Sequence, residues 1–154
     1  MEKEFDLLTQ TRKNVLSSID GLTLGQLNEI PEGFNNNIIW NVAHLLCTQQ
    51  LLCYGLAKLP LRYEKEFIDK TRKGTKPESA YTQEEISFIK EELLLSVETM
   101  SSDYNKGLFE GKEYPNYLTS YGVAISSIDV AINFNNIHEA LHYGYIMAQK
   151  KALE

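Results

Sequence analysis

The stretch NIIWNVAHLLCTQQLLCYGLA, residues 37–57, places apolar side chains on nearly every side of a helix. A helix that is apolar all round is buried among other elements. The chain contains no run of 18 apolar residues, so this helix is expected in a protein core and not in a membrane. Residues 37–57 therefore predict a fold in which one buried helix is packed against others.

Three further segments repeat apolar residues every three or four positions, which predicts helices. They begin near Phe5, at the Thr82–Glu85 capping box, and at Ser126 or Ser127. The first stops at Asp20 and has Arg12 as the single interruption of its apolar seam. Strand-like alternation is weak throughout. Four helices of this length predict an all-α fold, a four-helix bundle.

The connection between the second and third helices, residues 60–81, is unusually long. Antiparallel neighbours in a bundle are joined by about two to eight residues. A helix of about 20 residues is about 30 Å long, and an extended chain of about 3.3 Å per residue spans that length easily. The link therefore predicts an up-down-down-up bundle with a long crossover between helices two and three, and a lid is the alternative.

Length and composition narrow the class of protein. The 154 residues suit a single domain spanning 1–154. A formal charge of −6 disfavours nucleic acid and anionic membranes as partners, because both require a basic surface. Cys47 and Cys53 are too few for a disulfide scaffold, and the first residues show no apolar leader. A cytoplasmic location is expected.

The three histidines fall where they can meet. His138 and His142 lie four residues apart, so both occupy one face of the fourth helix, and His44 lies midway along the buried second helix. Three imidazoles would leave a fourth metal position open for water or substrate. Hydrogen-bonded core histidines are the alternative. Zinc, nickel, copper and iron all accept such ligands.

The segment HEALH, residues 138–142, also matches the H-E-x-x-H pattern of zinc metalloproteases. Those enzymes usually take a third ligand from downstream. The residues after His142 contain no histidine or aspartate, and their one acid is Glu154. The protease hypothesis is therefore disfavoured, and a third ligand has to come from upstream.

The sequence resembles the DinB-like (YfiT-like) superfamily of four-helix-bundle metal-binding proteins. The resemblance rests on WNVAHL at 40–45, HEALHYGYI at 138–146 and FNNNII at 34–39, with the long link between the second and third helices. It implies a divalent metal, nickel or zinc, held by His44, His138 and His142, and a homodimer.

Relatives in that superfamily include metal-dependent transferases that use low-molecular-weight thiols, such as bacillithiol transferases and mycothiol-dependent maleylpyruvate isomerase. The resemblance thus implies a metal-dependent thiol transferase acting on a small-molecule electrophile. No motif carries a thiol-binding residue onto this chain. A metal-dependent hydrolase and a non-catalytic metal- or partner-binding bundle stay open as alternatives.

Residues beside the histidines have more than one interpretation. Glu139 is the candidate catalytic residue, as a proton acceptor or a partner of a ligand, and a surface position is the alternative. Trp40, Asn135 and Tyr145 are candidates for the wall of the pocket, although core packing is favoured for Trp40 and Tyr145. Cys47 is either a further ligand or a small buried hydrophobe.

The segment 58–76 carries seven basic residues against three acids. A solvated loop is the simplest interpretation of such a charge excess. A docking patch for an anionic cosubstrate is the alternative if the link folds over the metal end.

Overall fold

Helices make up most of the chain, which confirms the all-α prediction. The computed structural model describes residues 1–154. The long helices are α1 (Glu2–Ile19), α3 (Ile38–Gln49), α5 (Gln83–Asn105) and α6 (Ile128–Ala152), and α3 continues into the π-helix η1 (Gln50–Gly55). The short elements are α2 (Leu24–Asn28), α4 (Lys65–Thr71), and an antiparallel pair of strands, β1 (Tyr117–Leu118) and β2 (Ala124–Ile125). No helix combines the length and the apolar character that a membrane crossing requires.

The helices start where the sequence places their caps. The Asn37 side chain accepts a hydrogen bond from the Trp40 amide at 2.9 Å, so α3 follows directly. Thr82 and Glu85 form the predicted capping box at the start of α5. The Ser127 hydroxyl caps α6.

The second predicted helix changes geometry along its length. Residues 38–49 are α-helical, whereas Gln50–Gly55 form wider π-helical turns. Turns of this kind are frequent at functional sites. Here Leu51, Leu52 and Gly55 line the cavity described below, so the irregular turns lie beside the candidate site.

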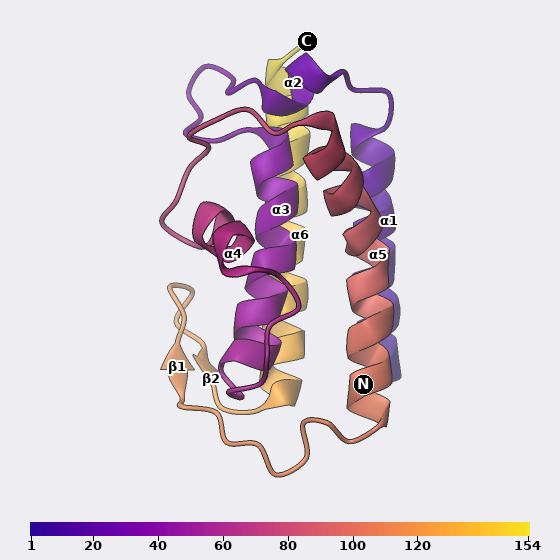
Figure 1. The fold of residues 1–154 in the computed structure, drawn as a ribbon, viewed down its shortest axis with the longest axis vertical. Coiled ribbons are helices and arrows are strands. Elements are labelled where there is room, and N and C mark those ends of the chain that lie inside the picture. Colours follow the sequence, from indigo (N-terminus) through magenta and orange to yellow (C-terminus); the bar gives the residue numbers. More distant parts are fainter.

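Contacts between helix pairs give their directions. The helix α1 packs against α5 and α6, and α3 packs against the same two helices. Asn136 donates to the carbonyl of Glu4, and Lys150 donates to the carbonyl of Ser18, so α1 and α6 run in the same direction. The N-terminus and the C-terminus accordingly lie at opposite ends of the molecule in Figure 1.

The helices α3 and η1 run in the same direction as α5. Gln49 donates to the carbonyl of Ser96, and further along Tyr54 donates to Asp103 at 2.8 Å. In Figure 1 the sequence colours advance from top to bottom along both α3 and α5, and from bottom to top along α6.

The link 60–81 lies along α3 and contains α4. Trp40 donates its indole N–H to the carbonyl of Lys70 at 3.1 Å, and His44 donates to the carbonyl of Thr71 at 2.6 Å. In Figure 1 the link rises from the lower end of α3 past α4 to the upper end of α5. The same segment therefore joins the two ends of the molecule and covers the histidine-bearing face of α3.

Candidate metal centre

The structure brings the three histidines together from two helices. His44 lies on α3, and His138 and His142 lie one turn apart on α6. One ring nitrogen from each lies within 4.8 Å of the other two. Ring centroids are 5.1 Å apart for His44 and His138, 4.8 Å for His44 and His142, and 4.5 Å for His138 and His142. Three imidazoles are thus positioned to bind one metal ion.

Hydrogen bonds orient two of the three rings. The Nδ1–H of His44 donates to the carbonyl of Thr71 at 2.6 Å, and the Nδ1–H of His142 donates to Asn41 Oδ1 at 2.8 Å. A proton on Nδ1 leaves the lone pair on Nε2 free to bind a metal. The Thr48 hydroxyl lies 3.3 Å from Nε2 of His44 and donates to it. Both rings are therefore held in the tautomer that a metal ligand needs.

The third ring, that of His138, has a polar atom without a hydrogen-bond partner. Nδ1 of His138 is buried and has no hydrogen-bond partner. Leaving a buried polar nitrogen unbonded is unfavourable, and a ligand or ion bound to that nitrogen would remove the cost. The donor set of three imidazoles and this unpartnered group fit a divalent cation.

Burial keeps the three imidazoles neutral at pH 7. Desolvation, followed by the charges of His142 and His44, lowers the pKa of His138 to about 3. Desolvation and the charge of His44 lower the pKa of His142 to about 4. Desolvation also lowers the pKa of His44, although its bond to Thr71 acts in the opposite direction. Histidine must be neutral to bind a metal, so the site is prepared electrostatically.

The histidines lie beside a cavity of about 700 Å³. The Trp40 ring is buried and stacks on His44 with the centroids 4.9 Å apart and the planes 9° apart. On the other side Phe134 lies 6.3 Å from His138. Leu51, Leu52 and Leu56 supply further apolar wall. A cavity of this volume is in the range that accepts a small organic ligand.

A comparison with protein families matches residues 7–146 to the DinB superfamily. The chain belongs to the DinB superfamily. The match extends from α1 almost to the end of α6 and confirms the resemblance stated from the sequence. A comparison with curated proteins finds no match. Membership of the DinB superfamily and the histidine cluster together favour a divalent metal.

Glu139, the predicted catalytic residue, points away from the cavity of this DinB-superfamily chain. Its carboxylate accepts hydrogen bonds from Arg12 Nη2 at 2.6 Å and from Asn135 at 2.9 Å. The alternative of a surface position is wrong, because Glu139 is fully buried. No polar contact joins its carboxylate to a histidine, and the catalytic role stays a prediction.

Arg12 is the partner that the sequence did not predict. All five of its N–H groups have acceptors, on Glu139, Gln49, Ser96 and the carbonyl of Leu93. These groups come from α6, α3 and α5, so one buried guanidinium joins all four long helices. The interruption of the apolar seam at Arg12 was the one signal in the sequence.

The other neighbours have different places. Trp40 is both buried in the core and part of the cavity wall, so both interpretations of this residue hold. Asn135 is buried but does not line the cavity, and core packing is wrong for Tyr145, which is 39% exposed. Burial raises the pKa of the Cys47 thiol to about 11, so at pH 7 it is a protonated buried group.

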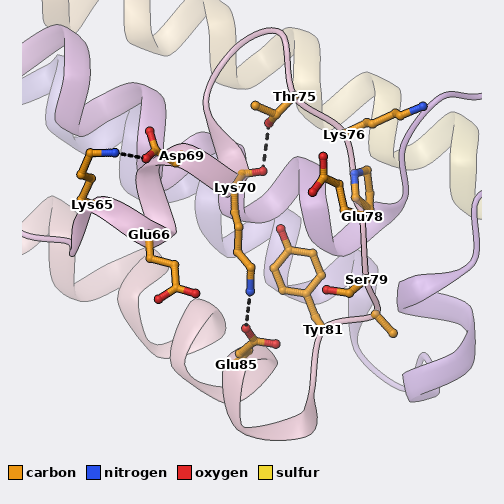
Figure 2. Close-up of a pocket in the computed structure, with 12 residues that line it drawn as sticks. Lys65, Glu66, Asp69, Lys70, Thr75, Lys76, Glu78, Ser79, Tyr81 and Glu85 are labelled. Atoms are coloured by element: carbon orange, nitrogen blue, oxygen red, sulfur yellow. Dashed lines mark hydrogen bonds and ion pairs between the residues drawn. The ribbon is translucent and has the colours of Figure 1, made fainter.

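A second hollow, a polar crevice of about 580 Å³, lies within the link. Figure 2 shows two ion pairs among its charged side chains, Lys65 with Asp69 and Lys70 with Glu85, whereas Glu66, Lys76 and Glu78 have no ion-pair partner. No histidine or cysteine lines it. The cavity beside the histidines is therefore the better candidate for chemistry.

Proposed function

We propose that His44, His138 and His142 hold one divalent metal ion, nickel or zinc, and that the protein is a metal-dependent transferase joining a low-molecular-weight thiol to a small electrophile. The single observation that supports this best is the trio of neutral imidazoles at one side of a ligand-sized cavity. The DinB-superfamily match supports the metal, and the thiol transferase activity rests on the resemblance stated from the sequence.

The metal would supply a Lewis acid that lowers the pKa of a bound thiol. The chain's own residues would position and shield the reactants. Thr71 and Asn41 fix the rings of His44 and His142. Trp40 and the leucines of η1 provide a dry apolar wall for the electrophile. No carboxylate lines the cavity, so the lining itself offers no carboxylate as a general base.

We expect the His44→Ala variant to lose its metal, measured by elemental analysis of protein purified without a histidine tag and incubated with zinc or nickel. Wild type should hold about one equivalent. The Asn41→Ala variant removes the acceptor that orients His142, together with three hydrogen bonds that the Asn41 amide donates to its surroundings, so its metal affinity should fall about 10- to 100-fold. Cys47→Ala is the matched control on the same helix and should keep the metal, because Cys47 is not part of the histidine cluster and does not line the cavity.

Wild type without metal in this experiment would overturn the ligand assignment. Once metal is found, monochlorobimane with a small thiol separates the activities. Thiol-dependent loss of monochlorobimane supports the transferase. Turnover of esters or amides without thiol would instead indicate a hydrolase, and neither activity would leave a non-catalytic metal-binding protein.

We propose a homodimer in the cytoplasm. Ile137, Leu141 and Tyr145 are 44%, 55% and 39% exposed and recur every four residues, so they form an apolar stripe on α6. Such a stripe favours association with a second copy. The free thiols of Cys47 and Cys53 agree with a reducing compartment. Light scattering that gives the mass of one chain at micromolar concentration would contradict the dimer.

We also propose that residues 1–154 form one domain, a four-helix bundle of up-down-down-up order. The parallel pairs α1 with α6 and α3 with α5 support this order, and the length of the link 60–81 permits it. An experimental structure with α3 and α5 antiparallel would contradict it.

A further inference from the structure

The segment 58–76 carries seven basic residues, and most of them are already paired with acids. Arg62 pairs with Glu92 at 2.6 Å, and Lys70 pairs with Glu85 at 3.2 Å. Lys65 and Arg72 both pair with Asp69. Three cations of this segment have no ion pair: Lys58, just before the link, and Lys73 and Lys76 within it. Three unpaired cations therefore remain as candidates for binding an anion.

Of these three, only Lys73 lines the cavity beside the histidines. The carbonyls of Lys70 and Thr71 accept hydrogen bonds from Trp40 and His44, so the backbone just before Lys73 is fixed to α3. Lys73 and Gly74 consequently form part of the cavity wall. The placement of this lysine is a consequence of the same bonds that orient the histidine cluster.

The other residues of the cavity wall determine the surroundings of the Lys73 ammonium group. No aspartate or glutamate lines the cavity, so nothing inside it neutralises Lys73. The apolar wall contains two aromatic rings, Trp40 and Phe134, in addition to leucines. On the far side the β1–β2 hairpin contributes hydroxyl groups, from Tyr117, Thr119 and Ser120. The lining thus combines an apolar and aromatic wall with hydroxyl groups, the histidine cluster and one unpaired cation.

We propose that Lys73 is the specificity-determining residue of this cavity and that its ligand has a flat apolar body and one anionic group. The apolar body lies against Trp40 and Phe134, and the anion lies at Lys73. The inference deepens the proposed function, because this ligand would be the substrate or the cosubstrate of the metal site. It depends on the cavity and the lysine, not on the metal.

Two fluorescent probes of similar shape test the charge. 8-Anilinonaphthalene-1-sulfonate carries a sulfonate, whereas N-phenyl-1-naphthylamine is neutral. Trp40 is the one tryptophan of the chain and lines the cavity, so binding in this cavity requires energy transfer from Trp40 to the probe. Both probes are titrated into the full-length protein, with and without Zn²⁺.

We expect Lys73→Gln to weaken binding of the sulfonate probe about threefold, which is typical of one exposed charge pair, and to leave the neutral probe unchanged. Lys73→Arg should restore sulfonate binding. Lys76→Gln is the matched control, because Lys76 is a second unpaired lysine of the link outside this cavity. Added salt should weaken the sulfonate probe in wild type and have less effect in Lys73→Gln.

Equal sulfonate affinity in wild type and Lys73→Gln would overturn the proposal, and so would an equal loss in Lys76→Gln. Absence of energy transfer from Trp40 would contradict binding of the probe in this cavity. The titrations without Zn²⁺ keep this result separate from the metal hypothesis: a protein that binds no metal but discriminates the probes through Lys73 would contradict the proposed function and support this inference.

Discussion

The Arg12→Met variant should lose about 3–5 kcal/mol of its free energy of unfolding at pH 7, the typical cost of removing one partner from a buried ion pair. Arg12 and Glu139 are both fully buried, with Nη2 and Oε1 2.6 Å apart. After the substitution the Glu139 carboxylate keeps only the bond from Asn135, and the acceptors on α3 and α5 lose their donor. Denaturation by guanidinium chloride measures the loss.

Arg62→Met is the matched control for burial. Arg62 also lies 2.6 Å from a glutamate, Glu92, but its side chain is 33% exposed. Its partner keeps a hydrogen bond from Tyr63. We expect this variant to lose clearly less stability than Arg12→Met, because solvent reaches Arg62 and Glu92 keeps the bond from Tyr63, although the Glu92 side chain is only 8% exposed. An equal loss in Arg12→Met and Arg62→Met would show that the buried position of Arg12 does not matter.

A double variant separates the charge from the packing. Arg12→Met with Glu139→Leu removes both charges and should be more stable than Arg12→Met alone, since no isolated carboxylate stays buried. If the double variant is less stable than Glu139→Leu alone, the hydrogen bonds from Arg12 to α3 and α5 contribute stability that does not depend on the ion pair. Either way, a loss of activity on changing Glu139 has to be corrected for stability.

The long helices could be predicted because their signals are local. Apolar spacing and the caps at Asn37, Thr82 and Ser127 are written in a few consecutive residues. The histidine cluster followed from helical spacing on one side, and from the burial of residues 37–57 on the other. Two helices that share a core bring their polar residues together when both polar residues lie on inward faces.

Other parts of the site had no local signal. Arg12 and Glu139 are 127 residues apart in the sequence, and neither segment contains a pattern that indicates the other as its partner. The acceptor for His44 is a backbone carbonyl at Thr71, which any residue type would supply. The burial predicted for Tyr145 was wrong because helical spacing does not say how far an apolar stripe extends around α6.

We expect the metal-free protein to lose stability as the pH falls from about 6.5 to about 5. The ordinary pKa of histidine, about 6.5, applies to the unfolded chain, whereas burial lowers that of His138 to about 3 and that of His142 to about 4. Below pH 6.5 the unfolded chain binds protons at these histidines and the folded chain does not, so the free energy of unfolding falls. Each histidine contributes about 1.4 kcal/mol per pH unit, or about 4 kcal/mol for the two by pH 5.

The direction of the pH dependence of stability distinguishes these histidines from surface groups in ion pairs. Above pH 6.5 both states are neutral at these positions, and the histidines add no pH dependence. A histidine with a raised pKa would have the opposite effect and would stabilise the protein in acid. Guanidinium chloride denaturation at pH 7, 6 and 5 in the presence of a metal chelator measures the slope. The double variant His138→Gln, His142→Gln is the control and should show a much flatter dependence.

Metal binding should raise the free energy of unfolding without changing its slope between pH 6.5 and 5. A divalent ion needs all three imidazoles neutral, which burial already ensures for His138 and His142 in the folded chain, and it adds about 2.7 kcal/mol at a free concentration of 100 times its Kd. The variant without His138 and His142 gains nothing from added Zn²⁺ at any pH. A slope that persists in that variant would place the titrating groups elsewhere. A slope that disappears there, without any stabilisation of wild type by Zn²⁺ or Ni²⁺ at pH 7, would show buried neutral histidines that do not hold a metal.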